Sequence, residues 1–271
     1  MPPPRAVRRF ASRLLAGTAV AMAAALMGCQ NFGDVTASIP ALSHMPSGEA
    51  QLRAYAEAAR ARYESNPGEK VASIDYAHAL RALTRYDEAV AVMQTAAIKA
   101  PKDEEVLGEY GKALADSGQL AQAKDVLTRA YTPDDPRWDV MSVQGAVADR
   151  MGDHAAAMRF YREALKIAPG EPSVLTNMGL SLALNRQLPE AEKTLRQAVA
   201  SPKADARMRG DLALVLALER KYAEAEEVSR ADLSAGDARA NVEAIKRMIA
   251  DSGPLQDLRK PAKAGAAQKE G

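Results

Sequence analysis

The chain has 271 residues, a formal net charge of +1 and one cysteine; 47% of its residues are hydrophobic but only 4% are aromatic. This length suffices for one elongated repeat array or for two globular domains. The near-neutral charge argues against nucleic-acid binding, and a single cysteine excludes a disulfide within the chain. Abundant alanine with few aromatic residues favours packing of helix on helix over a β-sandwich.

The N-terminal segment carries a positively charged leader followed by an apolar run. Four arginines occur before residue 14, and no acidic residue occurs before Asp34. The apolar run from Leu14 to Met27 is shorter than the about 20 residues that a membrane-spanning helix needs. The pattern predicts a secretory signal peptide over residues 1–28, which takes no part in the fold.

The apolar run ends in Leu26-Met27-Gly28-Cys29, which resembles the bacterial lipoprotein box. In that box the cysteine is lipidated and becomes the first residue of the mature protein. We therefore predict lipid attachment at Cys29, with an incidental thiol as the alternative. Gln30 follows the cysteine where inner-membrane lipoproteins carry aspartate, and by the same resemblance this implies the outer membrane. More than one acyl chain on the cysteine would make the anchor stable.

Two segments separate the predicted lipid site from the rest of the chain. Residues 29–48 contain Gly, Ser and two prolines without hydrophobic periodicity, and we expect a flexible tether. Residues 49–65 place Leu52, Tyr55 and Tyr63 on one helical stripe. Because no partner helix precedes this segment, we expect it to cap the N-terminal end of the helical array.

From residue 70 onward, small residues recur with a period of 34. One series is Ala89, Ala123, Ala157, Ala191 and Ala225, and a second is Ala77, Gly111, Gly145, Gly179 and Ala213. This period is typical of tetratricopeptide repeats (TPRs), each a pair of helices. The small residues allow helix axes to approach to about 8–10 Å. We expect repeats at about 70–103, 104–137, 138–171, 172–205 and 206–236.

The C-terminal part changes character after the fifth repeat. Residues 237–250 form an amphipathic pattern with Val242, Ile245 and Ile249 on one face, as expected of a capping helix. Residues 251–271 are rich in Gly, Pro, Lys and Ala, and we expect disorder. The predicted fold is therefore all-α, a right-handed TPR superhelix (α-solenoid) over residues 49–250.

No pattern for catalysis is present in the sequence. His44, His78 and His154 have no metal-ligand spacing, and Gly179-Leu180-Ser181 lies within a predicted helix rather than at a strand-to-helix turn. We therefore predict a protein that is not an enzyme, with no cofactor, metal or small-molecule substrate.

Stacked repeats form an extended concave face, so protein binding is the expected use of this fold. In TPR arrays the first helix of each repeat lines that face. Its phase selects seven candidate binding residues: Leu180, Leu184, Leu214, Leu218, Arg81, Lys112 and Asp149. The four leucines would form an apolar shelf for a helix or strand of a partner. Alternatively, the superhelix or the last capping helix covers them, and the sequence leaves both interpretations open.

Residues 172–233 and 241–250, together with the lipoprotein box, resemble the TadD-like TPR lipoproteins of tight-adherence (Tad or Flp) pilus assembly. The resemblance implies a lipoprotein on the periplasmic side of the outer membrane that helps the pilus secretin to localise or assemble. It implies Cys29 as the lipid site and supplies no catalytic residue. The alternatives are a scaffold for envelope enzymes or outer-membrane protein assembly unrelated to pili, and a soluble periplasmic adaptor if Cys29 is unmodified.

Overall fold

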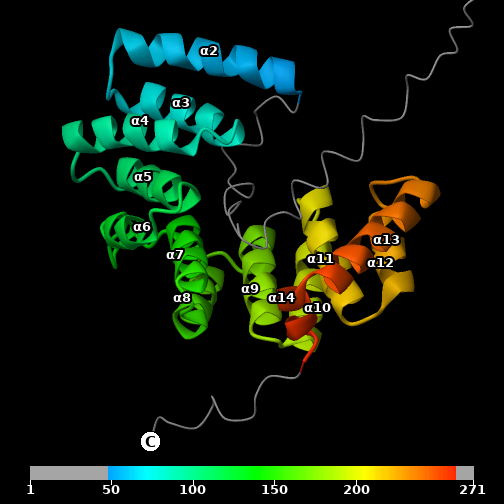
Figure 1. The fold of residues 1–271 in the computed structure, drawn as a ribbon. Helices are drawn as coiled ribbons and strands as arrows, with labels where there is room; N and C mark the ends of the chain where they lie inside the picture. The colour runs from blue at the N-terminus through cyan, green and yellow to red at the C-terminus, as the bar shows by residue number, and fades with distance from the viewer. Residues whose placement is uncertain (1–47, 261–271) are drawn as a thin grey trace, which may run out of the picture. The chain divides into compact units, whose positions relative to one another are not determined.

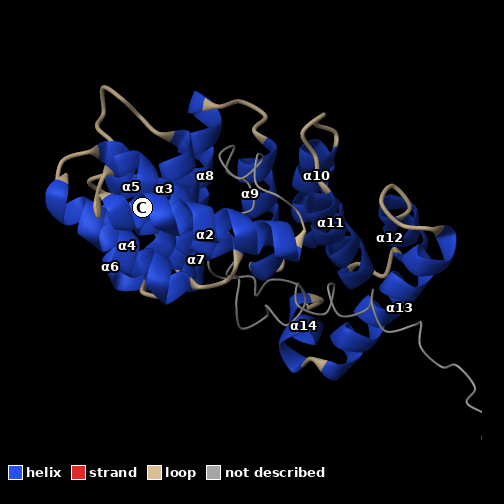
Figure 2. Ribbon diagram, turned by 90° about the horizontal axis from the view of Figure 1, so that it is seen from above, coloured by secondary structure: helices blue, strands red, loops and turns tan. Residues whose placement is uncertain are grey.

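The computed structural model describes residues 48–260, and every regular element in that range is a helix (Figure 1 and Figure 2). The helices are α2 (Glu49–Ser65), α3 (Lys70–Ala82), α4 (Tyr86–Lys99), α5 (Glu104–Asp116), α6 (Leu120–Leu127), α7 (Trp138–Arg150), α8 (His154–Ile167), α9 (Pro172–Leu184), α10 (Leu188–Val199), α11 (Ala206–Leu218), α12 (Tyr222–Ser229), α13 (Ala235–Asp251) and α14 (Gly253–Leu258). None of these helices is long and apolar enough to cross a membrane.

Five helical hairpins, from α3–α4 to α11–α12, follow one another along the chain, and the second helix of each packs on the first helix of the next. The first helices also contact one another in the order α3, α5, α7, α9, α11 and α13, whereas no two second helices are among the closely packed pairs. The first helices therefore share one face, which we call the first-helix face. The predicted all-α solenoid of helical hairpins is confirmed.

Small side chains are required where the two helices of a hairpin cross. A Cβ atom added to Gly145 would lie 2.5 Å from the ring of Tyr161, and one added to Gly179 would lie 2.6 Å from Leu195. Such distances force the helices apart, and overpacking a helix contact costs about 1–3 kcal/mol. The periodic small residues of the sequence are thus the close contacts within each hairpin.

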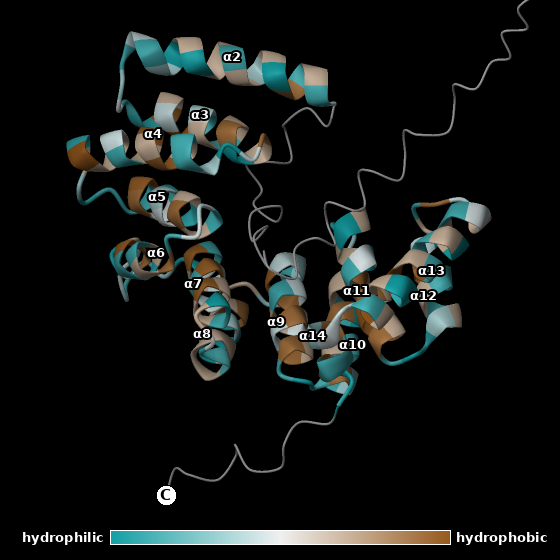
Figure 3. Cartoon of the chain, in the orientation of Figure 1, coloured by the Kyte–Doolittle hydropathy of each residue, from teal (hydrophilic) through white to brown (hydrophobic). Residues whose placement is uncertain are grey.

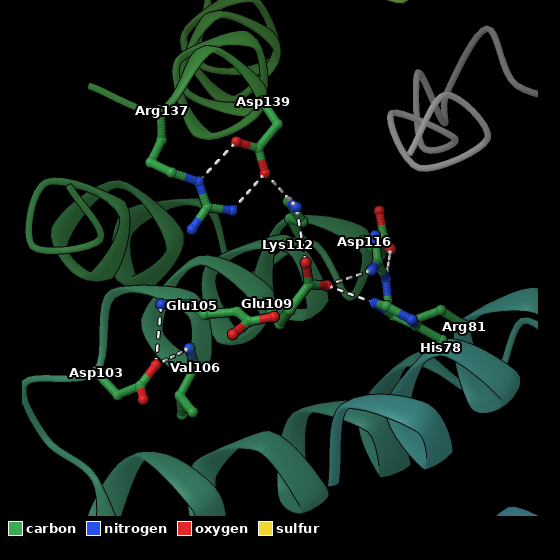
Figure 4. Close-up of polar contacts among 10 residues, drawn as sticks. All are labelled: His78, Arg81, Asp103, Glu105, Val106, Glu109, Lys112, Asp116, Arg137 and Asp139. Carbon is green, nitrogen blue, oxygen red and sulfur yellow. Dashed lines mark hydrogen bonds and ion pairs between the residues drawn. The ribbon is translucent and has the colours of Figure 1, made fainter. Parts of the chain in front are cut away.

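Each hairpin turn contains one residue in the left-handed region of backbone conformation. These residues again recur with the period of 34: Thr84, Gly118, Gly152, Arg186 and Arg220, with φ between 58° and 83°. A left-handed residue ends a helix by turning its last carbonyl groups toward new donors. At the other end, Asp103 caps α5 by accepting hydrogen bonds from the backbone N–H of Glu105 and Val106 (Figure 4).

The predicted disorder from residue 251 onward is wrong for residues 253–258, which form α14 against α11 and α13. Leu255 is 4% exposed. The guanidinium of Arg259 donates to the carbonyl oxygens of Ala217 at 3.0 Å and Leu218 at 3.1 Å, at the end of α11. Both carbonyls lie in the last turn of α11, and the arginine adds a tertiary hydrogen bond to each, so tertiary contacts stabilise a segment whose composition suggests disorder.

Several predictions from the sequence fall outside the described residues. They are the signal peptide over residues 1–28, the lipid site Cys29, nearly all of the tether over residues 29–48 and the remainder of the tail beyond residue 260.

Candidate functional site

The N-terminal half of the first-helix face carries seven charged or titratable side chains that contact one another (Figure 4). We call them the charged cluster: His78, Arg81, Glu109, Lys112, Asp116, Arg137 and Asp139. They come from α3, α5 and α7 and from Arg137, which immediately precedes α7. The cluster therefore joins three successive repeats.

Glu109 lies at the centre of the charged cluster. Its Oε2 atom accepts from Arg81 Nη1 at 3.3 Å and lies 2.8 Å from His78 Nε2. Its Oε1 atom accepts from Lys112 Nζ at 2.8 Å, and the same ammonium donates to Asp139 Oδ2 at 2.9 Å. The contacts run without a break from α3 to α7.

The ion pairs at the two ends of the charged cluster are as close as those of Glu109. Arg81 Nε donates to Asp116 Oδ2 at 2.7 Å. Arg137 holds both carboxylate oxygens of Asp139, at 3.0 and 2.9 Å. Three cations thus face three carboxylates, as burial of charge requires because an unpaired buried charge is strongly destabilising.

Arg81 and Lys112 were predicted to contact a partner, but the structure places both inside the charged cluster. Each side chain is only 1% exposed. Both side chains are therefore buried in ion pairs within the chain rather than exposed on the first-helix face. Helical phase identifies the face on which a residue lies, but it cannot show that Arg81 meets an acid 28 residues further along the chain.

The charged cluster favours the ionised forms of Glu109 and Asp139. Burial alone would raise the pKa of Glu109, but Lys112, His78 and Arg81 outweigh it and hold the pKa well below its usual value. The pKa of Asp139 is lowered in the same way, because Lys112 and Arg137 outweigh the effect of burial. These groups act as structural ion pairs near neutral pH.

Asp149, another predicted binding residue, is also occupied within the chain. Its Oδ1 atom accepts from Ser181 Oγ at 2.8 Å and lies 2.7 Å from His154 Nδ1, and its Oδ2 atom accepts from Tyr161 at 2.9 Å. The aspartate lies between serine and histidine, so the histidine cannot take the serine proton as a catalytic base would. This arrangement ties α7 to α8 and α9 and does not activate a nucleophile.

The four leucines of the apolar shelf lie on α9 and α11, at the other end of the first-helix face, and Figure 3 colours much of α9 as hydrophobic. Leu180, Leu184 and Leu214 are half-buried, whereas Leu218 is only 3% exposed. α14 contacts α11, and Arg259 binds the backbone at Leu218. The shelf is therefore closed at Leu218 and partly exposed at the other three leucines.

Asp211 is a residue of this face that the sequence analysis did not select. It lies on α11 one turn before Leu214, with 22% of its side chain exposed. Burial raises its pKa to about 6; Arg207 lowers the pKa and Asp205 raises it further, both more weakly than burial. A position-by-position comparison of the repeats would have identified Asp211, because it follows Glu109 by three periods of 34 residues.

No group of three or more His, Cys, Asp or Glu side chains placed to hold a metal ion occurs within residues 48–260.

Comparisons with known proteins agree with this architecture. The tetratricopeptide repeat family matches residues 80–141 and 150–213. No curated protein sequence matches the chain. Among solved structures, the chain is similar to PilW, described as a widely conserved type IV pilus biogenesis factor, with 19% identity, a TM-score of 0.53 and coverage of 78% of this chain and 92% of PilW.

Two further solved structures are similar in the same way. A thermophilic TPR protein of Thermus thermophilus shares 23% identity with a TM-score of 0.53, covering 64% of this chain and 96% of its own. PilF of Pseudomonas aeruginosa shares 19% identity with a TM-score of 0.51, covering 76% of this chain and 90% of PilF. At these identities the likeness concerns the fold alone. The sequence period, the stacked hairpins and the family match over residues 80–141 and 150–213 agree on the fold, which is a stack of helical hairpins of the tetratricopeptide repeat type.

Proposed function

We propose that this protein is a non-enzymatic scaffold, attached through a lipid on Cys29 to the periplasmic side of the outer membrane. There it would assist the localisation or assembly of a secretin in a Tad/Flp-type pilus system. The observation that carries the binding role is the apolar shelf, because three half-buried leucines, Leu180, Leu184 and Leu214, lie on one face of a repeat stack, and accessible apolar patches mark interfaces. The pilus role rests on the sequence resemblance of residues 172–233 and 241–250.

The structural comparisons are compatible with this role and do not carry it. PilW is a pilus biogenesis factor and has the same fold at low identity. Protein binding is the common use of stacked TPR hairpins, and the shelf lies within the segment that carries the resemblance. The assignment to a secretin is therefore tested best through the shelf itself.

A double substitution on the shelf tests the binding role. Leu180→Glu with Leu214→Glu puts two charges where a partner would bury apolar surface, and we expect loss of secretin multimers from the outer membrane. The matched control is Ile98→Glu on α4, where the isoleucine is exposed outside the first-helix face. Circular dichroism checks that both variants fold. Normal secretin multimers in a folded double variant would contradict the proposal and favour a scaffold unrelated to pili.

The anchor is tested separately by Cys29→Ser. We expect the variant to lose its lipid and to leave the membrane fraction, because no other residue can carry the diacylglycerol. Mass spectrometry of the mature N-terminus gives the modification directly. An unchanged distribution between membrane and soluble fractions would refute the anchor while leaving the binding role open.

A further inference from the structure

Asp211 occupies a site whose counterpart in the first half of the chain is filled by cations. A shift of 102 residues, three periods of 34, superposes the register of α3 and α5 on that of α9 and α11. Under this shift Glu109 corresponds to Asp211, and its three basic neighbours His78, Arg81 and Lys112 correspond to Leu180, Ala183 and Leu214. The acid is thus kept and its basic neighbours are replaced by apolar residues.

The two other acids of the charged cluster also correspond to uncharged residues under this shift. Asp139, which receives Lys112 in the charged cluster, corresponds to Asn241. Asp116 corresponds to Leu218, so the apolar shelf and the charged cluster occupy the same register. Asp211 forms an ion pair with Arg207, whose Nη1 atom lies 3.6 Å from Oδ2.

That distance is too long for a hydrogen bond, and Oδ2 of Asp211 is buried without a hydrogen-bond partner in the described part of the chain. Glu109 in the equivalent position receives three close contacts. A buried carboxylate oxygen without a donor is costly. The side chain of Asp211 as a whole is nevertheless 22% exposed, and Leu180 and Leu214, at the positions of His78 and Lys112, are half-buried, so a donor can approach the carboxylate from outside the chain.

We propose that Asp211, Leu180 and Leu214 form a binding site for a basic side chain, lysine or arginine, of a protein partner. The ammonium or guanidinium group would donate to the carboxylate of Asp211, as Lys112 donates to Glu109. The methylene groups of the same side chain would pack on the two leucines, as long basic side chains do beside apolar surface. This deepens the proposed function, since it rests on the chain binding protein partners through the first-helix face.

Two short peptides test the chemistry of the site. The probes are acetyl-Ala-Ala-Lys-Ala-Ala-amide and the same peptide with glutamine in place of lysine, each titrated to millimolar concentration at pH 7.5. We expect the lysine peptide to shift the methyl NMR signals of Leu180 and Leu214 saturably and to lower the pKa of Asp211, measured at its carboxyl carbon. The glutamine peptide should do neither. Equal responses to both peptides, or no response to the lysine peptide, would overturn the proposal.

Three variants distinguish specific binding at Asp211 from nonspecific attraction of the cationic peptide to acidic residues. Asp211→Asn should abolish the lysine response, while Asp75→Asn, at the equivalent position of α3, should leave it unchanged. Leu214→Lys fills the site from within, as Lys112 does in α5, and should lower the pKa of Asp211 and block the peptide while circular dichroism remains native. A lysine response that survives Asp211→Asn would overturn the assignment. If the native protein binds the lysine peptide but the folded Leu180→Glu/Leu214→Glu variant still gives normal secretin multimers, the basic-residue site stands and only the pilus role is refuted.

Discussion

At the scale of single residues, the structure depends on where each carboxylate finds its cations. Glu109 joins cations from α3 and α5, and Lys112 extends the contacts to Asp139 in α7. Asp211, at the same register three repeats later, has Leu180 and Leu214 at the positions of His78 and Lys112. The charged form of Glu109 is stabilised by its neighbours, whereas the charged form of Asp211 is destabilised by burial. Neutralising substitutions at the two positions should therefore change the free energy of unfolding in opposite directions.

Glu109→Gln should lower the free energy of unfolding at pH 7 by about 3 kcal/mol, because breaking a buried ion-pair network leaves the remaining charges uncompensated. Urea denaturation measures the change. Glu163→Gln is the matched control: Glu163 pairs with Lys166 on the exposed surface, and its loss should change stability by less than about 0.5 kcal/mol. Equal effects of the two substitutions would show that the charged cluster contributes no more than a surface pair.

The same cluster sets the acid stability. The pKa of Glu109 in the folded protein lies below its value in the unfolded chain, near 4.5, so the unfolded state takes up protons first as the pH falls. The stabilisation from Glu109 is complete above pH 4.5 and is lost below it. Denaturation midpoints recorded from about pH 6 to about pH 3 should therefore fall less steeply for Glu109→Gln than for the native protein. A parallel fall in both proteins would contradict this origin of the acid sensitivity.

Asp211→Asn should have the opposite effect. The pKa of Asp211 is raised from 3.8 to about 6, so its charged form is disfavoured in the folded state. Removing that charge should stabilise the protein at pH 7 by up to about 3 kcal/mol, since one pKa unit corresponds to about 1.4 kcal/mol. The gain should shrink as the pH falls through about 6 and vanish near 4. Urea denaturation at pH 7 and pH 4 checks it, and a loss of stability at pH 7 would show that the Arg207 pair outweighs burial.

At the scale of helices, local pattern predicts most of the architecture and tertiary contact decides the rest. The small residues at a period of 34 predict the hairpins because each one serves a contact within its own repeat, as Gly145 does against Tyr161. α14 could not be predicted in this way. Its six residues are too few to form a stable helix alone, and Leu255 and Arg259 find their partners only on the assembled stack.

Leu255→Ser with Arg259→Gln should release α14 while leaving the hairpins folded. Hydrogen exchange should show loss of protection over residues 253–258, because segments with few buried contacts open at low free energy. Lys260→Gln is the control, since Lys260 is exposed and pairs with Asp257 within the same turn. Retained protection in the double variant would mean that other contacts hold α14.

At the scale of the whole described domain, each repeat contacts chiefly its neighbours, so a disturbance should stay local. Glu109→Gln should accelerate hydrogen exchange in α3, α5 and α7 and leave α11 and α13 at native rates. Mass spectrometry after proteolysis resolves the two halves. Uniform acceleration across both halves would indicate a single cooperative unit instead.

The candidate site was harder to predict than the fold for a physical reason. Phase placed Arg81, Lys112, Asp149 and the four leucines on one face, but their exposure depends on pairings between repeats. His78 and Glu109 are 31 residues apart in sequence and 2.8 Å apart in space. Such pairings follow from the register of one helix against the next, which the period indicates only when the residues of all repeats are compared position by position.

Arg259 also bears on how many molecules can join end to end. It donates to the carbonyl of Ala217, and Arg150 donates to the carbonyl of Ala115, the equivalent position of α5. In the interior that donor comes from the following repeat; at the C-terminal end it comes from the residue after α14. Because Arg259 of the same chain supplies this donor, the end of α11 needs no second copy of the protein to supply it.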